Sequence, residues 1–231
     1  GDLADPDTLG VSGAATDLLV ADLGSSGGGP DGYADIALTI DGTPGQLYVF
    51  LNDGTGNVAL QATYNTGNGP SAITSGDYDH DGNTDLVVTN ALDDTFQAYL
   101  NTTGDPTALS PQPAVSTGDN PVDIITLDID NDTDDDVVIA CAGDGVPGGN
   151  GAVYGVIDFF ESTPALRQSF SNKQTLNTGK QPKGIKPGDI DPGGDKDEDV
   201  IITFSSSGQV GLLGHPGDAS DWQLDQLIEV G

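Results

Sequence analysis

The chain of 231 residues is strongly acidic, with 6 Lys and Arg against 37 Asp and Glu and a formal net charge of −31. Such a charge argues against binding to nucleic acid or to an anionic membrane surface, because no basic patch is present to neutralise phosphates. The single cysteine excludes an internal disulfide and a cysteine-based zinc site, and no apolar run is long enough for insertion into a membrane. Only three acids are glutamates, which leaves 34 aspartates, the acid preferred in tight turns and cation-binding loops.

Glycine and proline divide the sequence into short segments. The 34 glycines and 14 prolines separate brief runs of Val, Ile, Leu and Thr, which predicts an all-β fold with many turns. Two sets of four antiparallel strands are expected first along the chain. Their ranges are 15–21, 35–40, 47–51 and 60–65 in the first set, and 71–76, 85–90, 96–100 and 114–117 in the second.

One sequence element occurs three times, a Thr-Gly-x-x-Pro turn whose threonine lies eleven residues before the first aspartate of an Asp-rich loop. With a degenerate earlier copy, the loops end on four closing aspartates, spaced by 50, 51 and 63 residues: Asp35, Asp85, Asp136 and Asp199. A period near 50 residues is typical of four-stranded propeller blades. We expect one propeller-type domain or fragment over residues 1–231, with approximate blades at 11–66, 67–117, 118–178 and 179–231.

The Asp-rich loops are predicted to bind calcium. In the second loop, Asp77, Asp79 and Asp81 occupy positions 1, 3 and 5, Gly82 permits a sharp turn, and Asp85 closes the loop at position 9. Calcium takes six to eight oxygen ligands in a flexible geometry, which alternating carboxylates can supply, whereas zinc prefers His or Cys. We therefore expect about two to four Ca²⁺ ions in the whole chain.

The other three loops depart from this pattern. The third has Thr133 in the glycine position, the fourth has two extra residues within 192–194, and the first lacks a carboxylate at position 3. Solvated turns that bind no metal remain an alternative, most of all for the first and fourth loops. The candidate ligands are Asp22, Asp31, Tyr33 and Asp35 in the first loop, Asp77, Asp79, Asp81, Asn83 and Asp85 in the second, Asp128, Asp130, Asp132, Asp134 and Asp136 in the third, and Asp189, Asp191, Asp195, Asp197 and Asp199 in the fourth.

These turns and loops resemble the FG-GAP/VCBS repeat family, which includes the calcium-binding blades of integrin α-subunit propellers. The resemblance rests on residues 67–70, 118–121 and 179–182, each joined to its Asp-rich loop, and on residues 48–56. It implies calcium held at loop positions 1, 3, 5, 7 and 9, with position 7 contributing its backbone carbonyl. It also implies a ring of about seven blades. Part of a larger ring, half of a dimeric ring and a closed four-bladed ring are all compatible with four visible blades.

The leading functional interpretation is an extracellular, non-enzymatic module that calcium stabilises and that binds a protein or carbohydrate ligand, as in adhesion. A structural subunit of an extracellular assembly is one alternative, with self-association or further blades completing a ring. Part of a polysaccharide-degrading enzyme, such as a propeller-type lyase, is another. It is disfavoured because six basic side chains and two histidines offer few groups for acid–base catalysis.

Four other features are interpreted as structural or as surface elements. His80 and His215 are expected in turns, Cys141 as a buried inert thiol, and Trp222 in packing between blades rather than as a platform for sugars. The connections opposite the Asp-rich loops vary in length, so they are the expected contact face for a partner. The longest of them, at 142–151, is the first candidate.

Overall fold

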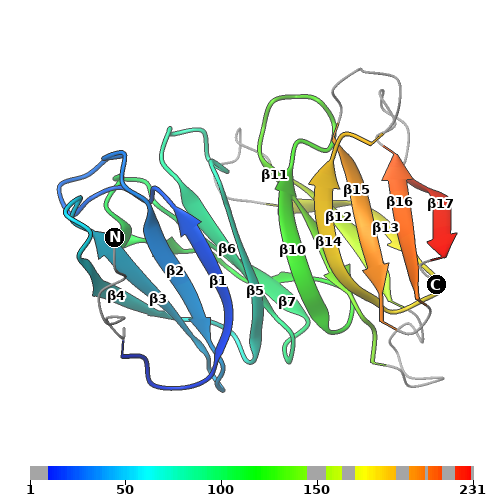
Figure 1. Cartoon of the computed structure of the whole chain (residues 1–231), viewed down its shortest axis with the longest axis horizontal. Helices are drawn as coiled ribbons and strands as arrows, with labels where there is room; N and C mark the ends of the chain where they lie inside the picture. The colour runs from blue at the N-terminus through cyan, green and yellow to red at the C-terminus, as the bar shows by residue number, and fades with distance from the viewer. Residues whose placement is uncertain are drawn as a thin grey trace, which may run out of the picture.

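The computed structural model describes residues 10–144, 155–162, 170–190, 198–205, 208–214 and 222–229, and these form four antiparallel sheets in chain order (Figure 1). The expected all-β architecture of antiparallel blades is thereby confirmed. The first, third and fourth sheets have four strands each, and the second sheet has five short ones. A single 3₁₀ turn, η1 (Pro106–Ala108), accompanies the strands in this part of the chain.

The first sheet consists of β1 (Ala15–Ala21), β2 (Asp35–Ile40), β3 (Gln46–Asn52) and β4 (Val58–Asn65), and the second of β5 (Pro70–Gly76), β6 (Asp85–Asn90), β7 (Thr95–Leu100), β8 (Ser110–Pro111) and β9 (Val115–Ser116). The third sheet consists of β10 (Pro121–Leu127), β11 (Asp136–Cys141), β12 (Val156–Ser162) and β13 (Phe170–Asn177). The fourth consists of β14 (Pro182–Gly188), β15 (Asp199–Phe204), β16 (Gln209–Gly214) and β17 (Gln223–Glu229).

The burial of each strand follows from its place in its sheet. All six residues of β6 and all six of β11 are buried, because neighbouring sheets cover both faces of these strands. After its closing aspartate, β11 accordingly consists of Val, Ile, Ala and Cys, whereas β6 combines a run of Leu and Val with the buried polar residues Thr89 and Asn90. The outer strands β4 and β13 alternate between partly buried and exposed residues, as expected where one face meets solvent.

Apolar cores fill the spaces between successive sheets, whose first strands contact one another in the order β1, β5, β10 and β14. Between the second and third sheets, the rings of Phe96 and Phe160 meet edge to face with centroids 4.9 Å apart. Between the third and fourth, the rings of Phe159 and Trp222 stack at 5.1 Å. Trp222 is only 2 % exposed, so its interpretation as a packing residue is confirmed. Cys141 is also buried, and burial raises the pKa of its thiol, as expected for an inert cysteine.

Each first strand carries a register shift at the same place, between its first and third residues. The residue after this shift is apolar in every sheet: Leu18, Ile73, Ile124 and Ile185. The last three are 6 %, 3 % and 0 % exposed because each packs against the preceding sheet, whereas Leu18 is 54 % exposed. Leu18 therefore lies on an outward face of the first sheet. Figure 1 shows the first and fourth sheets at opposite ends of the long axis, so the described residues form an open row rather than a closed four-bladed ring.

The two ends of the strands carry different loops. The Asp-rich loops join the first and second strands of each sheet, and the Thr-Gly-x-x-Pro turns lie at the other end with the second-to-third connections. Backbone hydrogen bonds tie these turns to the connections: Ala91 N donates to Gly69 O at 2.8 Å, and Gly143 N donates to Asp119 O at 3.0 Å. The face opposite the Asp-rich loops is therefore a continuous hydrogen-bonded surface.

The second sheet departs from the predicted pattern at its outer edge. The strand expected at 114–117 covers only Val115–Ser116 (β9), and a separate short strand, β8, precedes it; the two pair with different halves of β7. Pro111 and Pro113 explain the division, because proline has no backbone N–H to donate to the ladder. Of the connection at 142–151, only residues 142–144 are among those described. No helix within the described ranges is long and apolar enough to cross a membrane.

Replacing Trp222 with Ala should lower the free energy of unfolding by about 3–5 kcal/mol, because it empties the contact with Phe159 in the core between the third and fourth sheets. Urea unfolding followed by circular dichroism measures the effect. Leu92→Ala is the control, since Leu92 is 68 % exposed and its loss should change stability by less than about 0.5 kcal/mol. Equal effects of the two substitutions would contradict the packing role of Trp222.

Candidate metal loops

Each closing aspartate is a buried carboxylate held by backbone N–H groups. Asp85 Oδ2 accepts a hydrogen bond from Tyr78 N at 3.1 Å, and its Oδ1 accepts one from Asn101 N at 2.6 Å. The second residue of the loop and the end of the third strand are thus both fastened to the start of the second strand. The same pair of bonds recurs in the first and third sheets, from Leu23 N and Asn52 N to Asp35 and from Ile129 N and Ser162 N to Asp136.

The first aspartate of each of the first three loops organises the turn itself. Asp77 Oδ1 accepts a hydrogen bond from Asp81 N at 3.1 Å, and its Oδ2 accepts one from Gly82 N at 3.0 Å. Asp128 accepts the equivalent bonds from Asp132 N at 3.2 Å and Thr133 N at 2.9 Å. The loop backbone therefore curls around this carboxylate, and the side chains that follow are turned toward a common point.

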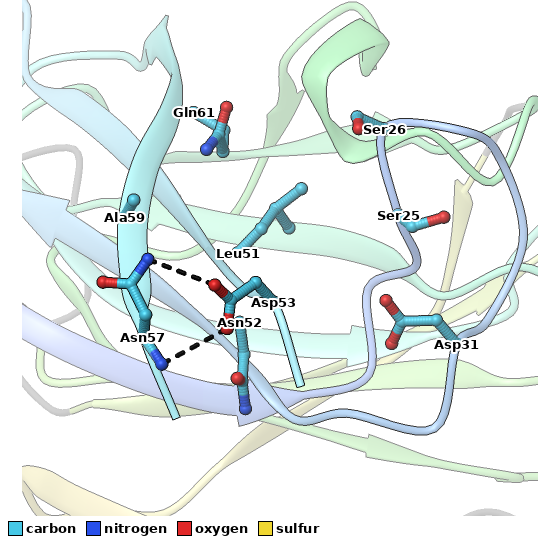
Figure 2. A pocket seen from close by; sticks show the side chains of 9 residues that line it. All are labelled: Ser25, Ser26, Asp31, Leu51, Asn52, Asp53, Asn57, Ala59 and Gln61. Carbon is cyan, nitrogen blue, oxygen red and sulfur yellow. Dashed lines mark hydrogen bonds between the residues drawn. The ribbon is translucent and has the colours of Figure 1, made fainter. Parts of the chain in front are cut away.

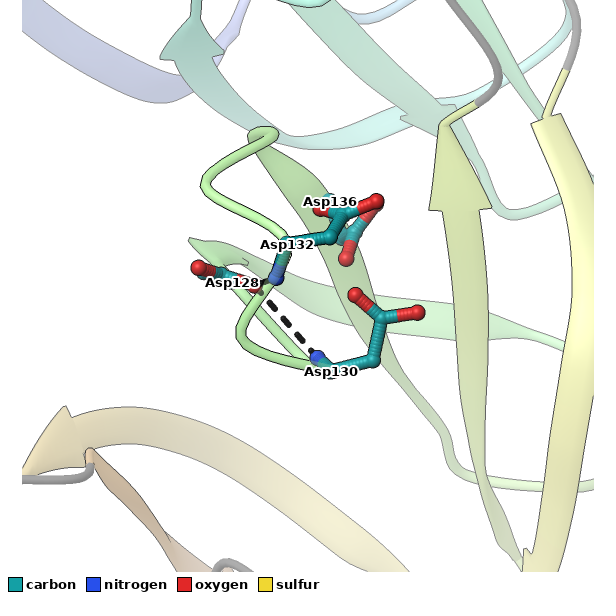
Figure 3. Close-up of side chains that lie close together, drawn as sticks. All are labelled: Asp128, Asp130, Asp132 and Asp136. Carbon is teal, nitrogen blue, oxygen red and sulfur yellow. Dashed lines mark hydrogen bonds between the residues drawn. The ribbon is translucent and has the colours of Figure 1, made fainter. Parts of the chain in front are cut away.

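Two groups of carboxylates converge in the described part of the chain. Their ligand oxygens all lie within 4.8 Å of one another, in one group formed by Asp77, Asp79 and Asp85 and another formed by Asp128, Asp130, Asp132 and Asp136. Figure 3 shows the carboxylates of Asp130, Asp132 and Asp136 gathered on one side of the third loop. In the second loop Asp81 Oδ1 instead accepts hydrogen bonds from the backbone and side-chain nitrogens of Asn83, both at 2.9 Å.

The convergence of carboxylates has an electrostatic cost. Burial raises the pKa of Asp85 and of Asp136 to about 7, and repulsion from neighbouring loop aspartates acts in the same direction, against the backbone hydrogen bonds that lower both values. Burial also raises the pKa of Asp35, with smaller contributions from Asp31 and Asp22. A cation at the centre of each group would favour the charged carboxylates and so oppose these shifts.

The donor set fits a hard divalent cation. Both groups consist of carboxylate oxygens without a nitrogen or sulfur ligand, which suits calcium and does not suit zinc. In the third loop, Asp130 Oδ1 is buried and has no hydrogen-bond partner among the described residues. A bound ion would satisfy this acceptor.

The first loop is arranged differently. Asp22 accepts hydrogen bonds from Gly24 N at 3.1 Å and Gly32 N at 2.8 Å, Asp35 is buried, and Tyr33 is 46 % exposed. These candidate ligands do not form a converging group of the kind seen in the second and third loops. The inserted residues instead border a small polar hollow of about 190 Å³, where Figure 2 shows Asp31, Ser25 and Ser26 across from Asp53 and Asn57.

The fourth loop is only partly described. Asp199 is buried and its Oδ2 accepts a hydrogen bond from Ile190 N at 2.9 Å, as in the other sheets, while Asp189 is exposed. The remaining candidates, Asp191, Asp195 and Asp197, lie outside the described residues, and so does His215. The bond from the second loop residue to the closing aspartate is therefore present in all four sheets, the bond from the end of the third strand is seen in the first three, and the converging groups are seen in two.

Three contacts of the Asp-rich loops were not predicted from the sequence. His80, expected only as a turn residue, places Nε2 2.7 Å from Asp134 Oδ1 in the next loop. Asp135 Oδ2 accepts a hydrogen bond from Asp77 N, and Lys173 Nζ lies 2.5 Å from Asp130 Oδ2. Asp135 fills the position before the closing aspartate, where the other loops have Ala34, Thr84 and Glu198. The acid at position 135 was the signal in the sequence for such a contact. Its partner, Asp77 N, could be identified only from the placement of the second and third sheets side by side.

Comparison with known proteins agrees with the repeat and the fold. The FG-GAP-like repeat family matches residues 30–88 and 77–139, and no curated protein matches the sequence. The crystal structure of BBS1N in complex with ARL6DN, soaked with lead, is similar in fold, with a TM-score of 0.56 and 15 % sequence identity. The similarity covers 96 % of this chain and 56 % of that one, so this chain spans little more than half of the length of its structural relative.

Exchanging the residues at position 6 of the second and third loops should shift stability in opposite directions. Thr133 has φ of 76° and Gly82 has φ of 85°, a region that is strained for a β-branched residue. Thr133→Gly should stabilise the calcium-free protein by about 1 kcal/mol, and Gly82→Thr should destabilise it by a similar amount. Urea titrations with chelator present measure both changes, and a loss of stability in Thr133→Gly would show that the threonine is not strained.

The calcium-free protein should become less stable as pH rises from about 4 to above 7. The folded pKa of Asp85 and Asp136, about 7, exceeds the unfolded value of about 3.9, so the folded state binds more protons in this window. Their stabilising contribution is complete below the unfolded pKa and is lost as pH passes the folded pKa. Melting temperatures of metal-stripped protein between pH 4 and 8 measure this slope, and saturating calcium should flatten it. A melting temperature that rises through this window without calcium would contradict the burial argument.

Proposed function

We propose that this chain is an extracellular, non-enzymatic module that calcium stabilises and that binds a protein ligand, and its match to FG-GAP-like repeats at residues 30–88 and 77–139 supports this. The observation that carries the proposal is the third loop, where Asp128, Asp130, Asp132 and Asp136 converge and Asp130 retains a buried acceptor. The second loop supports it with Asp77, Asp79 and Asp85.

Calcium would act here chiefly on folding. Each closing aspartate is already fastened to two or more segments of its sheet, so an ion bound to its carboxylate stabilises the junction of those segments. Because an unfolded chain does not gather these carboxylates, ion binding favours the folded state. The formal charge of −31 increases the benefit, since each ion removes repulsion within the chain.

Weak calcium binding by the third group would be consistent with an extracellular location. The third group has partly exposed members, and Lys173 lies beside Asp130 as an internal competitor for the same carboxylate. Calcium sites of extracellular modules bind in the range of about 10⁻⁴–10⁻³ M. A site of that strength would be filled at the calcium concentrations outside cells.

The surface opposite the Asp-rich loops is the proposed contact face for a partner. A hollow of about 620 Å³ lies there, bordered by Ala91, Leu92, Asp94, Asp119, Asn120, Gly143 and Asp144. Leu92 is 68 % exposed on the rim, and exposed apolar residues on a rigid scaffold commonly contact other proteins. The similar structure, BBS1N, is itself in complex with another protein, ARL6DN.

The alternatives differ in what they require. An assembly subunit would bind copies of itself, and a polysaccharide-degrading enzyme would need acid and base groups beside a substrate cleft. Among the carboxylates that converge here, those of Asp77 and Asp85 accept backbone N–H groups, and each group fits a cation, which favours the non-enzymatic proposal.

Calcium should raise the melting temperature, and one substitution in each group should remove one binding equivalent. At ten times the dissociation constant, two sites add about 3 kcal/mol, which corresponds to a rise of roughly 6–12 °C for a chain of this size. Asp79→Ala and Asp130→Ala each remove a ligand from one group only, and calorimetric titration counts the ions that remain.

Asp41→Ala is the matched control, because Asp41 is an exposed carboxylate on the connection between β2 and β3, at the opposite end of the strands. It removes the same charge and should leave stoichiometry unchanged. An unaltered melting temperature in calcium, or an unaltered stoichiometry in both ligand variants, would refute the proposed sites. Magnesium should stabilise less, because it loses its water ligands reluctantly.

A further inference from the structure

The Asp-rich loops of the second and third sheets are joined by side-chain contacts. Asp135 Oδ2 in the third loop accepts a hydrogen bond from Asp77 N, the first residue of the second loop, at 2.8 Å. His80 Nε2 in the second loop lies 2.7 Å from Asp134 Oδ1 in the third. The first contact uses the side chain of Asp135 and the backbone of Asp77, and the second uses the side chain of Asp134, a candidate ligand outside the converging group. Neither contact uses a carboxylate of the two converging groups.

A buried contact reinforces this connection at the base of the loops. Tyr78, which is 3 % exposed, places its hydroxyl 2.7 Å from Thr126 Oγ1, and Thr126 Oγ1 donates to Ser75 O at 2.9 Å. Tyr78 N is also one of the two donors that hold Asp85. A displacement of Thr126 in the third sheet would therefore be transmitted through Tyr78 to Asp85, the closing aspartate of the second sheet.

We propose that the second and third calcium sites are coupled, and that Asp135 is the positioning residue that couples them; the inference rests on the calcium binding proposed above. Asp135 directly precedes the ligand Asp136, so an ion in the third loop restricts the segment that carries Asp135. Its carboxylate then holds the N–H of Asp77, whose own carboxylate is the first ligand of the second loop. The first ion to bind orders this shared segment and bears the loss of conformational entropy. The second ion then binds to a segment that is already ordered, so its binding is more favourable.

Repulsion between two bound cations acts in the opposite direction. It is weakened by the surrounding excess of acids and by salt, since the Debye length is about 8 Å at 0.15 M ionic strength. At that ionic strength we expect the ordering effect to dominate, so that filling one site strengthens the other about fivefold, at the lower end of typical couplings.

The chain provides a signal specific to the third site. Trp222 is the only tryptophan, and its Nε1 donates to Ile129 O at 3.3 Å, between the ligands Asp128 and Asp130. Its fluorescence should therefore follow calcium binding in the third loop. The second site can be isolated by calorimetry in Asp130→Ala, and the third by Trp222 fluorescence in Asp79→Ala.

Coupling predicts that each isolated site binds calcium about fivefold more weakly than the same site in the unaltered chain at 0.15 M NaCl. The two factors must be equal, because coupling between binding sites is reciprocal. Equal affinities in the unaltered and single-site chains would overturn the coupling alone. Absence of calcium binding in the unaltered chain would instead refute the sites themselves, and the coupling with them.

Two substitutions of Asp135 test its role directly. Asp135→Ala and Asp135→Asn remove the same charge, but only asparagine keeps an oxygen that can accept the hydrogen bond from Asp77 N. In Asp135→Ala the second site should weaken about fivefold, and adding Asp130→Ala should weaken it no further. Asp135→Asn should retain coupling. If the second site bound calcium equally well in the Ala and Asn variants, Asp135 would not be the residue that couples the two sites. If the Ala variant fails to fold, the Asn variant and the two single-site chains still test the proposal.

Discussion

The structure depends on a buried carboxylate placed at the start of the second strand of every sheet. In the first three sheets, the two oxygens of Asp35, Asp85 or Asp136 accept N–H groups from the loop before it and from the end of the third strand. A short acid suits this role, because only the aspartate side chain keeps the carboxylate close enough to the backbone to reach both donors. The closing aspartate is thus a structural element first, and each Asp-rich loop is built around an anchor, a carboxylate that is buried in all four sheets.

This anchor explains why the loops can differ without loss of the fold. The first loop reaches its closing aspartate after a long insertion and gathers no group of carboxylates, yet Leu23 N and Asn52 N hold Asp35 as their equivalents hold Asp85. The fourth loop keeps the bond from Ile190 N to Asp199. The proposed ion binding would therefore be added to a common frame in particular loops, and the converging carboxylates it needs are present in the second and third loops.

Much of this organisation could be predicted from the sequence, because a repeat fixes spacing and a strand fixes which residues share a face. The strands β1, β2 and β6 begin and end at the expected residues, and the carboxylates of the third loop converge apart from Asp134. Contacts between loops were beyond prediction, since they depend on how one sheet is placed against the next. Asp81 lies outside the converging group, because its carboxylate accepts hydrogen bonds from Asn83, and this local pairing could not be read from the sequence. The division of β8 from β9 could have been foreseen from Pro111 and Pro113.

In the open row of described sheets, the second and third sheets are stabilised by neighbours on both sides, and the first and fourth sheets by a neighbour on one side only. A strand such as β6 is covered by a sheet on each side, whereas β1 carries Leu18 and Val20 on a face that is more than half exposed at both residues. In a linear array each unit is stabilised by its own contacts and by those of its nearest neighbours. Amide hydrogens should accordingly exchange most slowly in the second and third sheets and faster toward the first and fourth. The two loops that contact each other lie at the interface between the second and third sheets, where such an array unfolds last.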